Sequence, residues 1–293
     1  MSGPKKRKGG ISDPALHVLL VDNGSLQPAA THRLRKIAAA LSRRIGRRVE
    51  PVSLLHSNKV PGKKLGGRKA EILRTAVLRR LHRGAREFVI VPLFFGRSRA
   101  LTEFIPGLIG RWRAHSAEMR VHVAAPIAAA GDERLGRILE KQVREKLTPG
   151  FMRGRRARVA LVDHGSPVWA VTQARNRLAA QLRRRLGARV TGVAACSMER
   201  PTVPAGPIDS TETLLEHLLA TPPWNTGPVV VAQLFLLPGR HAGPDGDVAR
   251  ICRRAEEKSP GLRTVRTKLV GEDPALVAIL ADRYRSAKIG DGR

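Results

Sequence analysis

The sequence predicts an α/β protein of two tandem domains, each with a four-stranded, mostly parallel sheet flanked by helices. Short apolar runs typical of strands alternate with amphipathic helical patterns through both halves of the 293-residue chain. The run 87–95 is apolar on both faces, as expected for a central strand of a parallel sheet. In addition, Val-Leu-Leu-Val-Asp-Asn-Gly-Ser (18–25) returns as Val-Ala-Leu-Val-Asp-His-Gly-Ser (159–166), which indicates an internal duplication.

The first half contains expected strands and helices in strict alternation. Residues 1–13 are expected to form a disordered basic tail, and residues 14–150 the first domain. Apolar runs that end in glycine, proline or polar residues predict the strands, and an apolar face that recurs every three or four residues predicts the helices. The expected strands are 17–21, 49–55, 87–95 and 120–124, and the expected helices are 28–44, 70–81, 101–114 and 132–146.

The second half restarts the same order after a short basic linker at 151–156. Residues 157–287 are expected to form the second domain, and residues 288–293 a short tail. The expected strands are 158–162, 188–196, 228–237 and 262–269, and the expected helices are 170–186, 210–219, 247–257 and 273–286. Because the repeat is as long as a whole domain, it indicates domain duplication and not a solenoid of short repeats.

The chain carries a formal net charge of +30, with 54 lysines and arginines against 24 acidic residues. Such a charge attracts polyanions, which include nucleic acid, anionic membrane surfaces and small substrates rich in carboxylates or phosphates. Nucleic acid is disfavoured, because the arginines are spread over several helices and the aromatic residues that stack on bases make up only 3% of the chain. No apolar run could span a membrane and no signal-type segment follows the basic N-terminus, so we expect no membrane partner and a cytoplasmic location.

His164 and His241 are the candidate metal-binding and catalytic residues. Each follows an apolar strand through a turn that contains glycine, in Asp-His-Gly-Ser (163–166) and Pro-Gly-Arg-His (238–241). Since the carboxyl ends of parallel strands meet at one edge of a sheet, we expect the two imidazoles to converge there. Neutral imidazole binds cobalt, iron, nickel and zinc, and it titrates near pH 7. A lone histidine at a turn is more often structural, and it is the pairing that favours a site.

Further candidates lie on the same turns. Gly165 and Ser166 precede a helix, and a helix N-terminus favours an anionic group of a ligand. Gly239 and Arg240 lie on the second turn and are candidate substrate-binding residues as well. Glu199 follows the second strand of this domain and is expected at the same edge, either as a third ligand or proton acceptor or as a solvated loop glutamate.

Other polar residues of this half are not expected to belong to the site. Asp247 is expected to cap the helix that it precedes, and Asp209 and Glu212 to form a similar capping pair. Ser166 beside His164 suggests a Ser/His hydrolase. The chain has no Gly-x-Ser-x-Gly turn, however, and adjacent residues at a turn seldom face each other. A serine hydrolase is therefore disfavoured.

The motifs of the second half resemble those of sirohydrochlorin chelatases of the CbiX/SirB type, which belong to the class II chelatases. They are Asp-His-Gly-Ser (163–166), Met-Glu-Arg-Pro (198–201) and Phe-Leu-Leu-Pro-Gly-Arg-His (235–241). The resemblance covers nearly the whole chain as two tandem chelatase-like domains. It implies insertion of Co(II) or Fe(II), with nickel also possible, into sirohydrochlorin or a related tetrapyrrole without ATP or an organic cofactor. It further implies that His164 and His241 are the metal-binding and catalytic histidines, with Glu199 as their acidic partner.

The chemistry of chelation is consistent with these residue types. Two pyrrole protons have to leave the ring, and the metal has to lose its waters. We expect the metal to bind both imidazoles, Glu199 to assist, and the histidines to accept the pyrrole protons. An anionic tetrapyrrole rich in carboxylates would also give the +30 charge a use other than nucleic acid.

The first half lacks the candidate residues, since Asn23, Asn58 and Ser98 stand where His164, Glu199 and His241 are expected to have their counterparts. Asparagine and serine are poor ligands for these metals, so we expect a degenerate first domain and one active pocket. Two alternatives stay open: a non-catalytic metal- or tetrapyrrole-binding protein of the same fold, and a polyanion-binding module. The sequence does not predict the oligomeric state.

Overall fold

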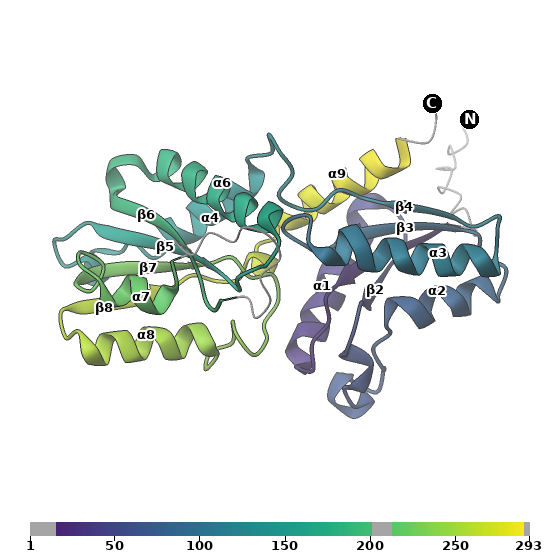
Figure 1. Ribbon diagram of the computed structural model, residues 1–293, viewed down its shortest axis with the longest axis horizontal. Coiled ribbons are helices and arrows are strands. Elements are labelled where there is room, and N and C mark those ends of the chain that lie inside the picture. Colours follow the sequence, from purple (N-terminus) through teal and green to yellow (C-terminus); the bar gives the residue numbers. More distant parts are fainter. Residues whose placement is uncertain (1–15, 201–212, 290–293) are drawn as a thin grey trace, which may run out of the picture.

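The computed structural model describes residues 16–200 and 213–289, which form two α/β lobes side by side (Figure 1). The expected tail 1–13, most of the expected tail 288–293 and the predicted capping pair Asp209 and Glu212 lie outside the described residues. Within the described ranges, no helix is long and apolar enough to cross a membrane.

The first lobe is built on an entirely parallel sheet with the strand order β2-β1-β3-β4. Its strands are β1 (Leu16–Asp22), β2 (Val49–Ser53), β3 (Glu87–Pro92) and β4 (Arg120–Val123). The helices between them are α1 (Pro28–Ile45), α2 (Leu73–Leu81) and α3 (Ile105–His115). The central strands β1 and β3 are buried on both faces, as helices on both sides of a parallel sheet require.

The second lobe repeats this topology with the order β6-β5-β7-β8, again entirely parallel. Its strands are β5 (Ala157–Asp163), β6 (Val190–Ser197), β7 (Gly227–Gln233) and β8 (Leu262–Arg266). The helices between them are α6 (Trp169–Leu186), α7 (Leu215–Ala220) and α8 (Asp247–Lys258). The predicted fold class, two tandem α/β domains with four-stranded sheets, is confirmed.

Several expected strands end before their apolar runs do, β2 at Ser53 and β8 at Arg266 among them, and two of these strands end beside a cavity. β3 ends at Pro92 instead of residue 95, and β7 ends at Gln233 instead of residue 237. The neighbouring strands β1 and β5 end at Asp22 and Asp163, so the pairing stops with the bonds from Leu93 N to Val21 O and from Leu234 N to Val162 O. The apolar residues that remain, 93–95 and 234–237, leave the sheets and line a cavity between the lobes.

The last helix of each half packs on the other lobe. α4 (Arg134–Arg144) lies against α6 and β7 of the second lobe, whereas α9 (Leu276–Ile289) lies against α1, β3 and β4 of the first (Figure 1). Ion pairs support this exchange, among them Lys141 Nζ with Asp273 Oδ2 at 3.0 Å and Arg283 Nη2 with Asp132 Oδ2 at 2.6 Å. The exchanged helices therefore hold the two sheet edges that face the cavity at a fixed separation.

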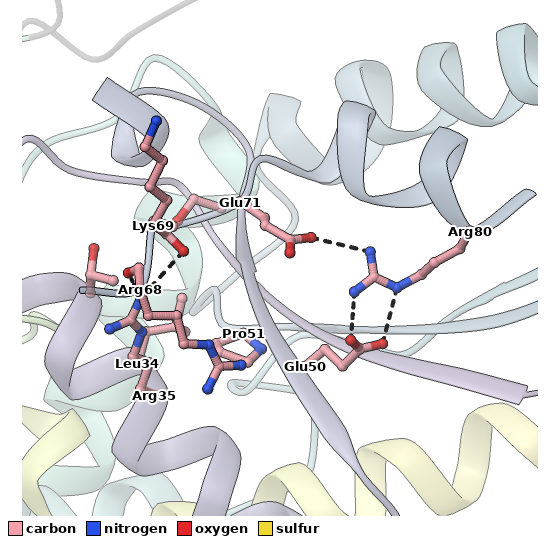
Figure 2. A pocket seen from close by; sticks show the side chains of 11 residues that line it. Leu34, Arg35, Glu50, Pro51, Arg68, Lys69, Glu71 and Arg80 are labelled. Carbon is pink, nitrogen blue, oxygen red and sulfur yellow. Dashed lines mark hydrogen bonds and ion pairs between the residues drawn. The ribbon is translucent and has the colours of Figure 1, made fainter. Parts of the chain in front are cut away.

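A buried ion cluster fixes the long connection between β2 and α2 (Figure 2). Arg80 donates to both carboxylate oxygens of Glu50, at 3.1 and 2.5 Å, and to Glu71 at 3.2 Å. Burial opposes ionisation of Glu50, but hydrogen bonds from Arg80 and His17 lower its pKa to about 2. Arg35 donates to the carbonyl of Leu65 at 2.7 Å and so anchors the loop, which contains short 3-10 turns.

Candidate active site

A cavity of about 620 Å³ lies between the lobes, at the carboxyl ends of β1, β3, β5 and β7. Ligands of open parallel sheets bind at this edge, and the volume is typical of a small-molecule site. The first lobe contributes Asp22, Asn23 and Ser98 to the lining, and the second contributes His164 and His241. The two candidate histidines, expected to converge, thus share one cavity.

The imidazole rings of His164 and His241 face each other, with ring centres 4.7 Å apart and an angle of 46° between the ring planes. His164 follows β5 directly, and His241 follows the turn after β7. Since metal–nitrogen bonds are about 2 Å long, this separation allows one ion to be held by a nitrogen of each ring. Two imidazoles from neighbouring strands therefore form a two-point site that opens on the cavity.

Asp247 orients the ring of His241. Its Oδ2 atom lies 2.5 Å from His241 Nδ1. An ionised carboxylate only accepts hydrogen bonds, so Nδ1 carries the proton and Nε2 keeps its lone pair for a metal. The sequence predicts that Asp247 caps α8. In the structure Gly246 is the N-cap and Asp247 is the first helical residue, so its carboxylate bonds His241 instead of capping the helix. His241 and Asp247 are six residues apart in a turn, and nothing in the sequence indicated that their side chains would form a hydrogen bond.

His164 has an acidic partner of its own. Its Nε2 atom lies 3.2 Å from Oε1 of Glu199, at the end of β6, which is the partner that the sequence predicts. Burial lowers the pKa of His164 below its ordinary value, the charge of Glu199 opposes this shift, and the neighbouring His241 adds to it. A lowered pKa keeps the imidazole neutral at pH 7, which is the form that binds metal.

A buried network holds the turn that carries His164. Asp163 accepts hydrogen bonds from Arg175 Nη1 and the Gly165 amide, both at 3.1 Å, and from Ser197 Oγ at 3.3 Å. Gly165 has φ of +98°, and a Cβ atom there would lie 2.2 Å from the carbonyl oxygen of Glu199. Glycine is therefore required by both the backbone conformation and the close approach of the second strand.

The four residues expected to bind substrate anions, Gly165, Ser166, Gly239 and Arg240, all line the cavity. The Gly165 amide donates to Asp163 Oδ1 at 3.1 Å, so its hydrogen is engaged within the protein, and the substrate-binding role of the four residues stays a prediction. The side chain of Arg240 is 80% exposed, and its Nε atom lies 3.9 Å from Asp247 Oδ2. Arg99 of the first lobe also lies on the lining with a side chain 53% exposed, so cations are present on both walls.

Among the described residues, no group of three or more histidine, cysteine, aspartate or glutamate side chains forms a closed metal cage. The His164–His241 pair is consequently an open site in which most coordination positions of an ion would be left to water or to another ligand. Structural metal sites are closed, and open sites are typical of ions that take part in chemistry.

A family model described as CbiX matches residues 17–146 and 158–287. The chain belongs to the CbiX family. The two matched segments are the two duplicated halves, so the predicted family and its tandem repeat are confirmed. No curated protein sequence matches this CbiX-family chain.

Several solved structures share this fold over nearly the whole chain. SirB from Bacillus subtilis with Fe3+ is 18% identical, with a TM-score of 0.67 over 95% of this chain and 98% of that one. The sirohydrochlorin chelatase SirB from Bacillus subtilis subspecies spizizenii in complex with cobalt is 16% identical, with a TM-score of 0.64 over 95% and 97%. CbiX, the terminal enzyme for biosynthesis of siroheme in denitrifying bacteria, is 17% identical, with a TM-score of 0.57 over 92% and 99%. At these identities the likeness establishes a shared two-lobed fold.

The first lobe of this CbiX-family chain has the same turn without the site. Leu54 N donates to Asp22 O and Leu55 N to Asn23 O, just as Met198 and Glu199 bond the carbonyls of Asp163 and His164. Leu55 is therefore the counterpart of Glu199, and the predicted counterpart Asn58 is wrong. Asp22 pairs with Ser53, whereas Asp163 pairs with Ser197, so the second lobe has three additional residues between its first two strands. A constant offset between the halves therefore misaligned the residues that follow the second strand.

The described residues also form hollows outside the cavity, one of them about 650 Å³ between α6, β6 and Trp224. The one beside Arg35, Glu50 and Arg80 in Figure 2 holds about 30 Å³, which is room for little more than water. A groove of about 550 Å³ along Leu55 and Phe104 shares Asn23, Arg99 and Ala100 with the inter-lobe cavity and continues it over the first lobe.

Proposed function

We propose that this protein is a metal chelatase that inserts a divalent ion, cobalt or iron and with nickel possible, into sirohydrochlorin or a related tetrapyrrole. The observation that carries the proposal is the pair of facing imidazoles on an inter-lobe cavity, each with its own carboxylate partner. A pair of neutral nitrogen ligands binds a first-row ion and still leaves it positions for exchange. The reaction needs no ATP or organic cofactor on this proposal.

The residues divide the work by their chemistry. His164 and His241 hold the incoming ion, and Asp247 fixes the tautomer of His241. Glu199 lies within 3.2 Å of His164, where it assists by accepting a proton or by joining the ion as a third ligand. Arg99 and Arg240 attract the peripheral carboxylates of the ring from opposite walls.

The apolar runs after β3 and β7 support a flat macrocycle as the occupant. Leu93, Phe94 and Phe95 line the cavity from the first lobe, and residues 234–237 line it from the second. A tetrapyrrole presents apolar faces and an acidic rim, so apolar walls below cationic side chains match its distribution of charge. The chelatase names of the structural relatives, SirB and CbiX, agree with this substrate class.

The test is metal insertion followed by the change in tetrapyrrole absorbance. We expect the purified full chain to convert sirohydrochlorin with Co(II) or Fe(II), and the double variant His164→Ala/His241→Ala to lose turnover. His115→Ala is the matched control, because His115 lies on α3 outside the cavity and bonds its own helix. Undiminished insertion by the double variant would overturn the assignment of the histidines.

The same assay separates the alternatives. Stoichiometric binding of metal or tetrapyrrole without turnover identifies a non-catalytic binding protein of the same fold. A polyanion-binding module would instead bind nucleic acid with steep salt dependence, and replacement of His164 would not change that affinity. The predicted cytoplasmic location is tested by fractionation of cells that express the protein.

A further inference from the structure

The first lobe retains one acidic group of the duplicated turn, and it is unusual. Asp22 ends β1 and lines the inter-lobe cavity, although only 5% of the residue is exposed. Within the described part of the chain, its Oδ1 atom has no hydrogen-bond partner. Ser98 Oγ on the same wall is also buried without a partner in that part of the chain. Buried polar atoms are nearly always bonded, so two unsatisfied oxygens on one cavity wall point to a ligand that donates hydrogen bonds.

Comparison of the two lobes shows that Asp22 differs from its counterpart Asp163 in its partners. Its counterpart Asp163 is neutralised by Arg175, which is 4% exposed and reaches across from α6. The corresponding position on α1 is Leu34, a core residue. No described arginine, lysine or histidine forms an ion pair with Asp22. The same carboxyl position is thus a fixed anion in the second lobe and a group without a cation in the first.

The environment of Asp22 makes it a stronger base than an ordinary carboxylate. Burial raises the pKa of Asp22 to about 6, and hydrogen bonds from Ser53 and the Gly24 amide oppose the shift. The other charged or titratable groups on the described lining are Arg99, Asp163, His164, Arg175, Arg240 and His241. A carboxylate with a pKa near the working pH is suited to take up a proton from a bound ligand.

The proposed chelation needs such a group. Insertion of a divalent ion releases two protons from pyrrole N–H groups, and each neutral imidazole has one lone pair. A lone pair of His164 or His241 that binds the ion cannot hold a proton at the same time. Glu199 can take one of the two protons, so the other needs an acceptor that is neither Glu199 nor a histidine bound to the metal.

We propose that Asp22 accepts one pyrrole proton of the bound tetrapyrrole on the first-lobe side of the cavity, while His164 and His241 deliver the metal from the second-lobe side. In this step a pyrrole N–H bond breaks and an O–H bond forms on the Asp22 carboxylate, directly or through one water. The electron pair stays on the pyrrole nitrogen and becomes a donor pair for the ion. The inference rests on the proposed function and assigns a role to the lobe that lacks histidines.

The test compares the wild-type protein with Asp22→Asn, which keeps the shape of the side chain and removes its basicity. With sirohydrochlorin and Co(II) as probes, we expect kcat to fall about 100-fold or more, as for loss of a general base. The dissociation constants of ring and metal, from fluorescence quenching and metal titration, should change less than about twofold. The low-pH limb of kcat/KM should become shallower, because one ionisation is removed and that of His164 stays.

Two further variants control the test. Thr31→Val removes another unpartnered buried oxygen, which lies on α1 but not on the described lining of the cavity, and should leave turnover unchanged. Leu34→Arg restores the cation that Asp163 has in the second lobe. Leu34→Arg should lower kcat and move the low-pH limb of kcat/KM to lower pH. If Asp22→Asn does not fold, this variant tests the role of Asp22 in its place.

The outcomes distinguish this inference from the proposed function. An active wild-type protein with undiminished kcat and an unchanged pH profile in Asp22→Asn overturns the role of Asp22 alone. A wild-type protein that binds the ring but inserts no metal overturns the proposed function, and the role of Asp22 with it. Loss of turnover with intact binding and a changed low-pH limb supports both.

Discussion

The raised pKa of Asp22 has a measurable consequence for folding that does not depend on any substrate. Burial moves this pKa from 3.8 to about 6, and each pKa unit corresponds to about 1.4 kcal/mol. Between the two values the folded protein binds a proton that the unfolded chain has released, so stability falls as pH rises. Relative to Asp22→Asn, the wild-type free energy of unfolding should therefore decrease by about 2 kcal/mol between pH 4 and pH 7.

The assay is urea denaturation of the full chain, without metal or tetrapyrrole, at steps of pH from 4 to 7. All other titrating groups are shared by the two proteins, so their contributions cancel in the difference. In a Leu34→Arg background the same comparison should lose this pH dependence, because the arginine stabilises the carboxylate. Parallel stability curves for wild type and Asp22→Asn would refute the reasoning, and a difference of opposite sign would mean that the folded protein holds Asp22 as a stabilised anion.

Three substitutions test the remaining architecture. Asp247→Asn should weaken metal binding about 10- to 100-fold without unfolding the protein, because His241 loses the carboxylate that fixes its tautomer; calorimetric titration with Co(II) measures it, and equal affinity would contradict that role. Gly165→Ala should destabilise the fold by about 1–3 kcal/mol, because alanine would adopt positive φ and meet the Glu199 carbonyl; an unchanged melting temperature would contradict it. Arg80→Met should destabilise by about 3 kcal/mol in thermal unfolding, because it leaves buried carboxylates without their cation, and milder loss would show that water replaces it.

Much of this architecture could be predicted from local patterns. The repeated Val-Asp-x-Gly-Ser stretch marks the same turn in both lobes, and the all-apolar runs mark the central strands. The convergence of His164 and His241 followed from one rule, that parallel strands end at a common edge. Their roles in metal binding and catalysis stay predictions until they are measured.

The features that escaped prediction depend on contacts between distant segments. The sequence could not predict that α4 and α9 each pack on the opposite lobe. An amphipathic pattern indicates that one face of a helix is buried, but it does not indicate which lobe covers that face. The overlong strands have a related cause. The sequence of an apolar run does not show whether its last residues pair in a sheet or line a cavity. Residues 93–95 and 234–237 line the cavity.

The comparison of Asp22 with Asp163 required both the repeat and the structure. The sequence places aspartate at the same point of both turns. Only the structure shows that Arg175 neutralises Asp163, whereas the corresponding position on α1 is the core residue Leu34. If the carboxylate were needed only to accept a hydrogen bond from the glycine amide of the turn, an ion pair like that of Asp163 with Arg175 would stabilise the turn better in both lobes. The unpaired acid makes the first lobe less stable near neutral pH than it could be.

The two walls of the cavity differ in the charge that each can accept. The second lobe offers neutral nitrogen atoms, backed by Asp247 and Glu199, which suits a divalent cation. The first offers a buried carboxyl and unsatisfied oxygens, which suit protons. Exchange of one divalent ion for two protons conserves charge in the ring, so an enzyme for it benefits from separate positions for the two kinds of cation. Duplication followed by divergence of one copy provides this separation, because each lobe then contributes one wall to a single cavity.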